Sequence, residues 1–376
     1  MWQFNGDAAV EFLSAAYFPE YFHVDKTRIN RPGYPVLAKA LGEGYGLLVL
    51  PIYKLNPLEK GMLGYITLKL AIYITTAICL FNLIRTKFSA QVALISVTLL
   101  LLHPFAIRYI GTFHTSELQF VTPIILVTLL LNLAKNYSHR KNIIYSLIAG
   151  FMMLAKQNYS VYLAILLFSF FVIKRYKESI LSFVSHLIPL LLWLVCLKFF
   201  NLPYYNHEVA SNNDGIWLIT GLFNGHIFAT IQSLINFSKD WLIMITSYFT
   251  GFIFLAVAAI HVPEIKAKLS NKEWLFLLIF IGANWLQFLA ANSPAPHLTS
   301  DLAFFVYPLA AYLIYRFTNQ HNLNRFIPAF FAIYLVIGLM SMVRLPWVHP
   351  YQQNGVTNPD RVKILEEGKL IPRNSN

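Results

Sequence analysis

The sequence predicts an all-α protein, a transmembrane bundle of about ten helices with short amphipathic helices ahead of them. Composition carries most of this prediction, because 57% of the 376 residues are hydrophobic and only 12% are charged, whereas soluble domains contain about 25% charged residues. A water-soluble core cannot absorb so much apolar surface, and the mean hydropathy of +0.55 agrees. The aromatic content excludes a disordered chain, and two cysteines, Cys79 and Cys196, are too few for a disulfide scaffold.

The predicted spans are apolar stretches that recur along the chain. Several are shorter than the roughly 20 residues that a perpendicular span needs, so their ends are approximate. They lie at 62–84, 90–108, 118–134, 142–155, 159–173, 180–200, 239–261, 273–291, 301–316 and 326–343.

Positive charge in alternate connections between these spans predicts the orientation. The connections hold 13 basic residues against three acidic ones, whereas the rest of the chain contributes only +2 to the net charge of +12. This is the positive-inside pattern, so the connections are expected to face the cytoplasm, and no nucleic-acid partner is needed to explain the charge. The basic residues are Arg85, Lys87, Lys135, Arg140, Lys141, Lys174, Arg175, Lys177, Lys266, Lys268, Lys272, Arg316 and Arg325.

This orientation places residues 1–61, the connections 201–238 and 292–300, and the tail from Arg344 on the outer side. We therefore expect one transmembrane domain over 1–343 and a short outer tail over 344–376. The compact loops suggest a bacterial inner membrane, with the outer side facing the periplasm. Because a long outer N-terminal segment needs something to carry it across, either a helix ahead of Met1 is missing or the number of spans is off by one; we favour the missing helix.

The first outer segment is predicted to contain interfacial helices. Residues 7–22 indicate a short amphipathic helix that ends at Pro19, with Asp7 following Gly6 at a position like an N-cap. Residues 31–55 are apolar but contain several prolines and glycines, so we expect broken helices that lie on the outer interface.

Charged and polar residues gather at the predicted outer ends of the helices. Charges near the membrane are costly and usually face a cavity or a partner, so this group suits a reaction on a lipid-borne substrate. A plainer explanation is that each residue caps a helix or makes an interfacial ion pair; for Lys69, inside the first span, we expect pairing with an outer acid or snorkelling. The group contains Asp7, Glu11, Arg28, Arg31, Arg108, His114, Glu117, Lys156, Gln157, His207, Glu208, Asp214, His297 and Asp301.

Four short motifs follow one another within this group. They are Gly6-Asp7-Ala8-Ala9-Val10-Glu11-Phe12, Arg31-Pro32-Gly33-Tyr34-Pro35, Ser116-Glu117-Leu118 and Ala149-Gly150-Phe151-Met152-Met153-Leu154-Ala155-Lys156-Gln157. Their order resembles that of the C-type (GT-C) glycosyltransferases, polytopic enzymes that use lipid-phosphate sugars and include mannosyltransferases and aminoarabinose transferases. The resemblance covers roughly residues 5–175.

The resemblance implies three roles. Asp7 matches the first-loop acid, the general base for the acceptor hydroxyl; Arg31 matches the basic residue that contacts the lipid-linked phosphate; Glu117 matches an acid that lines the same cavity. The chain departs from the family in having Ala8 where a second acid often stands, with Glu11 one turn later. The helix that normally precedes the Asp is absent, and no late Arg occurs in 299–302, which leaves the acceptor open.

Elementary chemistry supports the same division of labour. A sugar on a polyprenyl phosphate has a good leaving group, so positive charge beside the phosphate helps most, and Arg28, Arg31 and Lys156 are candidates. One positioned carboxylate suffices as the base, and attack opposite the phosphate inverts the anomeric centre. We count Glu11, Tyr34, Gln157 and His297 among the substrate-binding candidates, although an interfacial tyrosine more often belongs to an aromatic belt. The histidines lack metal-ligand spacing, so neither a metal nor another cofactor is predicted.

Two other functions stay open. A membrane polysaccharide polymerase or ligase predicts functional Arg and His in a large outer loop, but residues 201–238 contain no Arg. A transporter or flippase predicts broken helices and polar residues at mid-membrane, where this sequence is almost uniformly apolar apart from residues such as Asn284 and Gln287. The predicted partners are thus a polyprenyl-phosphate-sugar donor, a lipid, glycan or protein acceptor, and membrane lipids.

Overall fold

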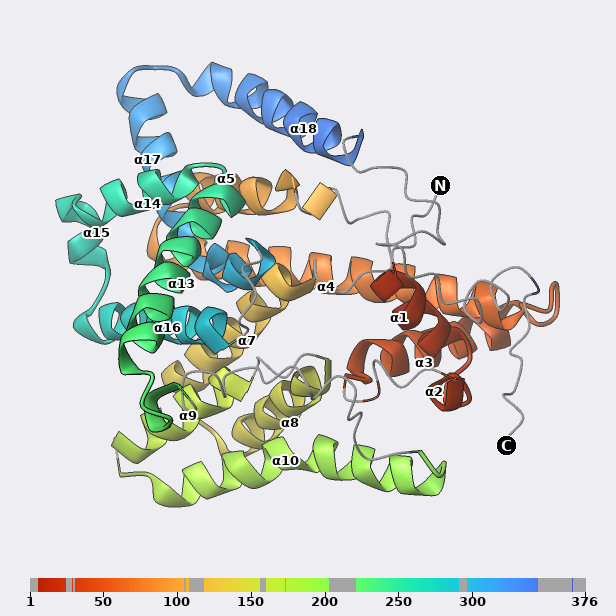
Figure 1. Ribbon diagram of the computed structural model, residues 1–376. Coiled ribbons are helices and arrows are strands. Elements are labelled where there is room, and N and C mark those ends of the chain that lie inside the picture. Colours follow the sequence, from red (N-terminus) through yellow and green to blue (C-terminus); the bar gives the residue numbers. More distant parts are fainter. Residues whose placement is uncertain are drawn as a thin grey trace.

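The computed structural model describes residues 6–24, 29, 31–104, 106–107, 118–155, 160–172, 174–202, 221–290, 296–343 and 367. Helix accounts for 86% of the structure, and the described part contains no strand, which confirms the all-α prediction. Each predicted apolar stretch is mostly helical over its described residues (Figure 1).

The helices fall into two groups along the chain. The first group is α1 (Gly6–Ala16), α2 (Tyr21–Val24), α3 (Gly33–Val49), α4 (Pro57–Lys87), α5 (Ala90–Leu101), α7 (Leu118–Lys135), α8 (His139–Ala155), α9 (Ser160–Val172) and α10 (Tyr176–Phe199). The second group is α13 (Ile227–Tyr248), α14 (Phe252–Ile260), α15 (Pro263–Lys268), α16 (Asn271–Ala290), η3 (Pro296–Leu302), α17 (Ala303–Gln320), η4 (Asn324–Phe326) and α18 (Ile327–Val343).

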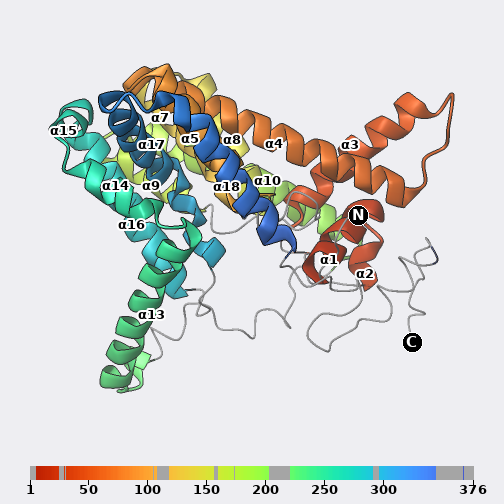
Figure 2. The same ribbon diagram turned by 90° about the horizontal axis from the view of Figure 1, so that it is seen from above.

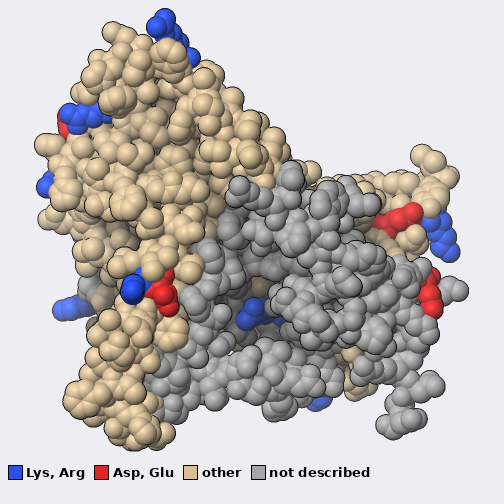
Figure 3. Space-filling view, turned by 45° about the horizontal axis from the view of Figure 1, so that its top comes forward, with Lys and Arg blue, Asp and Glu red and all other residues tan. Residues whose placement is uncertain are grey.

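Two of the described helices are long and apolar enough to cross a membrane, α4 with 31 residues and α10 with 24. Both expose large apolar side chains, among them Ile74 and Ile78 on α4 and Leu191 and Val195 on α10. Wide parts of the described surface carry no charged residue (Figure 3). Exposed apolar surface of this extent is typical of contact with lipid. The prediction of membrane-capable helices is confirmed, while the number of about ten spans stays a prediction.

The predicted span at 239–261 is not one straight helix. It divides into α13 and α14, which meet at an angle of 103°. The break occurs where Thr250 and Gly251 take φ angles of +48° and +85°, a left-handed conformation that cannot continue a helix. The pair is therefore either a broken span or a re-entrant segment.

The bundle interior beside this break is more polar than the sequence suggested. Nε2 of His103 lies 2.8 Å from the carbonyl oxygen of Tyr248 at the end of α13. Because a carbonyl can only accept, the His103 ring donates this hydrogen bond and satisfies a group that the break leaves without a helical partner. The ring also stacks on Tyr248 and meets Tyr307 edge-on. His103, Tyr248 and Tyr307 are all buried.

Helices α3 and α4 form a hairpin that extends from the rest of the bundle (Figures 1 and 2). The expectation of broken helices in 31–55 was wrong for 33–49, because α3 is continuous over 17 residues. Its glycines serve close packing: a β-carbon at Gly42 would collide with the backbone of Lys60, and one at Gly64 would collide with the carbonyl oxygen of Ala38. A capping box between Asn56 and Glu59 then starts α4.

This packing predicts opposite effects of one substitution at two glycines of the hairpin. Gly64→Ala is expected to lower the unfolding temperature in detergent, since overpacking against backbone costs about 1–3 kcal/mol. Gly44→Ala is the matched control, because a β-carbon there meets open space, and alanine stabilises a helix relative to glycine by roughly 0.5–1 kcal/mol. Equal melting temperatures for the two variants would contradict the close α3–α4 contact.

Candidate functional site

The predicted site begins on α1, which covers one side of the α3–α4 hairpin. The predicted helix over 7–22 is shorter in the structure: α1 ends at Ala16, ahead of Pro19, and α2 follows at Tyr21. The helix already includes Gly6, so Asp7 lies in its first turn and not at the N-cap, a place that also favours an acid because of the helix dipole. The side chain of Asp7 lies outside the described part.

Glu11 and Lys69 are the buried charged residues in this region. Glu11 on α1 is 3% exposed and Lys69 on α4 is 4% exposed. The burial of Lys69 excludes the predicted snorkelling, because a snorkelling ammonium reaches water. The two helices pack closely, since a β-carbon at Gly61 would lie 3.1 Å from that of Ala16.

The Arg31 segment opens α3 at the point where α3 touches α8. A β-carbon at Gly33 would lie only 2.6 Å from the backbone nitrogen of Ala155, the last residue of α8. Arg31 is partly exposed there, and Tyr34 is buried. Lys156 and Gln157 follow Ala155 directly in sequence. The structure thus brings two of the four motifs together through their backbones.

A tryptophan that the sequence reasoning missed holds the chain just ahead of Arg31. Nε1 of Trp193 on α10 donates a hydrogen bond of 3.1 Å to the carbonyl oxygen of Ile29. Both residues belong to a small apolar cluster with Phe22, Leu154 and Leu197. This cluster joins α2, the end of α8 and the end of α10. A buried indole needs a partner for its N–H, but nothing in the sequence identifies Ile29 as that partner.

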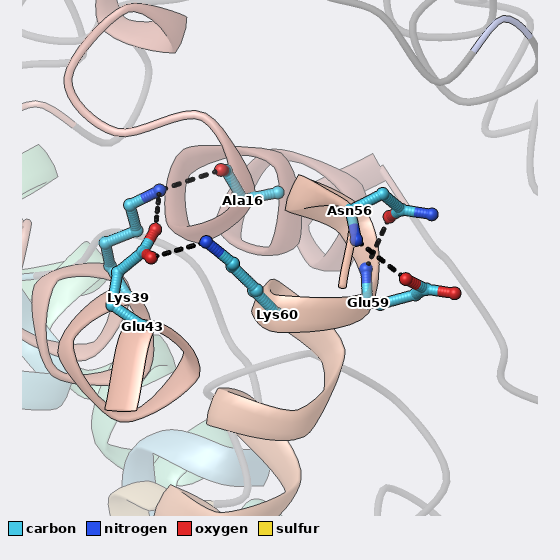
Figure 4. A network of polar contacts seen from close by, with 6 residues as sticks. All are labelled: Ala16, Lys39, Glu43, Asn56, Glu59 and Lys60. Carbon is cyan, nitrogen blue, oxygen red and sulfur yellow. Dashed lines mark hydrogen bonds and ion pairs between the residues drawn. The ribbon is translucent and has the colours of Figure 1, made fainter. Parts of the chain in front are cut away.

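A second group of polar contacts, also unpredicted, joins α1, α3 and α4 (Figure 4). The ammonium groups of Lys39 and Lys60 form ion pairs with the Glu43 carboxylate, at N–O distances of 2.8 Å and 2.6 Å respectively. Lys39 also donates a hydrogen bond of 3.3 Å to the carbonyl oxygen of Ala16. Hydrogen bonds from Lys39 and then Lys60 hold the pKa of the Glu43 carboxyl below its usual value. The i,i+4 spacing of Lys39 and Glu43 was the available sequence signal.

The remaining predicted site residues lie wholly or partly outside the described part of the chain. Arg28, Glu117, Lys156 and Gln157 lie outside it altogether, and so does the side chain of His297. The helix that carries His297, η3, packs against α7, whose first residue follows Glu117. Within the described residues no three His, Cys, Asp or Glu side chains are grouped so that they could hold a metal ion.

A family model matches the part of the chain that runs from α4 to the end of α10. Residues 58–200 match the dolichyl-phosphate-mannose-protein mannosyltransferases, a family of the GT-C superfamily. The match includes the Glu117 and Lys156 motifs and begins after those of Asp7 and Arg31. Neither a curated protein nor a solved structure matches the chain. The GT-C resemblance is confirmed, and together with the apolar helices it supports a membrane glycosyltransferase of this type.

Proposed function

We propose that this chain moves a sugar from a polyprenyl-phosphate carrier to a hydroxyl of a lipid, glycan or protein acceptor. The contact between Gly33 and Ala155 carries the proposal, since it joins the Arg31 segment to the Lys156 segment, and Arg31 and Lys156 are both candidate cations for the donor phosphate. By the positive-inside pattern, the reaction takes place on the outer face of the membrane, the periplasmic face in a bacterial inner membrane.

The donor phosphate is proposed to bind at the start of α3. As the sugar–phosphate bond breaks, negative charge grows on the phosphate, and a guanidinium can meet it with two parallel hydrogen bonds. Arg31 takes this role, with Arg28 and Lys156 as further cations. Tyr34, Gln157, His297 and Glu11 complete the proposed set of substrate-binding residues.

The acceptor hydroxyl is proposed to lose its proton to Asp7. Its oxygen attacks the anomeric carbon, while the bond from that carbon to the phosphate oxygen breaks and leaves its electron pair on the phosphate. Attack on the face opposite the phosphate inverts the anomeric centre. Glu117 lines the same site and helps to orient the acceptor.

The helix break between α13 and α14 favours a second candidate, a transporter or flippase. Broken helices at membrane depth are the usual sites of substrate binding in transporters. Here, however, the His103 ring donates a hydrogen bond to the carbonyl oxygen of Tyr248, and the rings of Tyr307 and Phe249 pack edge to face beside it. The break is therefore filled by side chains of the protein itself, and the glycosyltransferase is the better supported function.

An assay of bond cleavage separates the two candidates. The purified protein in proteoliposomes is given polyprenyl-phosphate mannose, labelled in the sugar, together with lipid, glycan and peptide acceptors. A glycosyltransferase is expected to release free polyprenyl phosphate in step with label on an acceptor. Recovery of the intact lipid-linked sugar on the other leaflet, with no cleavage, would contradict the proposal and favour the flippase.

A further inference from the structure

Four cations gather where the connection between α7 and α8 meets the connection between α9 and α10. The guanidinium of Arg175 lies over the ring of Tyr137, 5.2 Å from its centroid, and Nζ of Lys141 donates a hydrogen bond of 3.5 Å to the carbonyl oxygen of Asn136. Because Asn136 and Tyr137 are neighbours in the chain, the two contacts bring both cations to one connection. With the lysines on either side of Arg175 they form the basic patch, Lys141, Lys174, Arg175 and Lys177.

The packing of α8 against α10 holds the basic patch in place. Nδ2 of Asn142 donates a hydrogen bond of 3.2 Å to the carbonyl oxygen of Glu178. Eight residues further along each helix, a β-carbon at Gly150 would collide with the carbonyl oxygen of His186. The two helices therefore start side by side and run in the same direction from the patch (Figure 1).

The protein does not neutralise the charge of the basic patch. In another connection expected to face the cytoplasm, Glu264 pairs with Arg316 at 2.9 Å. The ion pairs among the described residues include neither Lys174 nor Lys177, and they do not include Glu178, the nearest acid in sequence. Both lysines are exposed. An exposed group of like charges without a counter-charge on the protein attracts an anion from outside it.

Exposed apolar side chains begin beside the patch, and they point to a lipid as that anion. Lys177 lies in line with Ile180, Val184 and Leu191 on one face of α10, because residues three, seven and fourteen positions apart share a helix face. These three side chains are 64%, 52% and 56% exposed, and Phe171 at the end of α9 is 62% exposed. Helix α10 is long and apolar enough to cross a membrane. A ligand that meets cations at one end and an apolar stripe below them has the chemistry of a phospholipid.

We propose that the basic patch binds the headgroup of an anionic phospholipid, whose acyl chains lie along the exposed stripe of α10. The positive-inside pattern places this site in the cytoplasmic leaflet, where anionic lipids attract clustered Lys and Arg. Arg175, stacked on Tyr137, offers its planar fork to the phosphate, and the lysines add point charges. The site is separate from the proposed site of sugar transfer, which meets α8 at its other end, at Ala155, so it does not depend on that activity.

Lipid binding to the full chain in a neutral detergent tests the inference. Native mass spectrometry measures the affinities for dioleoyl-phosphatidylglycerol and dioleoyl-phosphatidylcholine, which have the same acyl chains but differ in net charge. The unaltered protein is expected to prefer the anionic lipid. The triple variant Lys174→Gln/Arg175→Gln/Lys177→Gln is expected to bind phosphatidylglycerol about 10- to 100-fold more weakly, because each cation near the lipid surface contributes roughly fivefold. Its affinity for phosphatidylcholine is expected to stay unchanged.

The variant Arg140→Gln/Lys266→Gln/Arg325→Gln is the matched control. It removes the same charge from exposed positions in connections expected to face the cytoplasm. Arg140 precedes Asn142 by two residues and is therefore turned by about 200° around α8, away from α10. This variant is expected to keep the preference for phosphatidylglycerol.

Four outcomes would overturn the inference. They are equal affinity of the unaltered protein for the two lipids, an unchanged preference in the folded patch variant, equal losses in the patch variant and its control, and displacement of phosphatidylglycerol by soluble glycerol phosphate at the same concentration. The third would indicate an effect of net charge alone, and the fourth would indicate a site for free phosphate. If the triple variant does not fold, Lys174→Gln/Lys177→Gln leaves the contact of Arg175 with Tyr137 intact and is measured instead.

Discussion

Asp7→Asn is expected to reduce sugar transfer by about 10²- to 10⁴-fold, the usual effect of removing a positioned general base. The substitution keeps the size of the side chain and its place in the first turn of α1, so the fold is expected to survive. Donor binding is expected to stay close to normal, because the base acts on the acceptor. The measurement is initial rate against donor concentration, with melting temperature as a check on folding.

Glu20→Gln is the control for this prediction. Glu20 is exposed and lies in the turn that follows α1, so the substitution removes one carboxylate from the same region without changing the proposed site. Full activity of Asp7→Asn would remove Asp7 from the role of base. Equal losses in both variants would point to a general effect of charge on this part of the protein.

Arg31→Ala is expected to raise the donor concentration needed for half-maximal rate by roughly 10- to 100-fold, while Arg31→Lys is expected to raise it distinctly less. A lysine keeps the positive charge but not the two-pronged fork, so the lysine variant separates charge from geometry. The initial rates of both variants are measured against polyprenyl-phosphate mannose.

Arg140→Ala is the control for this comparison. Arg140 is exposed near the start of α8, at the end of that helix away from Ala155, and its removal is expected to leave donor use unchanged. If Arg31→Ala and Arg31→Lys raise the donor concentration for half-maximal rate by the same factor, Arg31 does not contact the phosphate through its two-pronged guanidinium. A loss in Arg140→Ala of the same size would indicate an effect of net charge on the lipid substrate.

Hydrophobic patterning predicted the helices well because burial in lipid depends on composition over a whole segment. The stretch at 62–84 lies within α4, and the stretch at 180–200 lies within α10 except for its last residue. The pattern failed at glycines, because the effect of a glycine depends on the helix that packs against it. Gly42 and Gly46 lie within α3, where α4 packs against them, whereas Gly251 takes part in the break between α13 and α14. The same residue type thus supports a helix in one place and interrupts it in another.

The sequence offered the candidate site as a set of motifs, which stays a prediction, and it could not offer their arrangement. The order of the Asp7, Arg31, Glu117 and Lys156 motifs indicated a GT-C glycosyltransferase, and the family match over 58–200 agrees. The contact of Gly33 with Ala155, by contrast, joins residues far apart in the chain. No local pattern determines such a contact, because it depends on the packing of α3, α8 and α10 as a group.

The sequence by itself determined an all-α chain with apolar helices and a resemblance to the GT-C glycosyltransferases. These properties are sums over local composition and short motifs, so they do not depend on which helices are neighbours. Only the tertiary structure decided that α3 is one helix, that α13 and α14 are bent by 103°, and that Lys69 is buried. Burial and register are properties of pairs of helices, and they follow from close packing between surfaces that the chain brings together only when it folds.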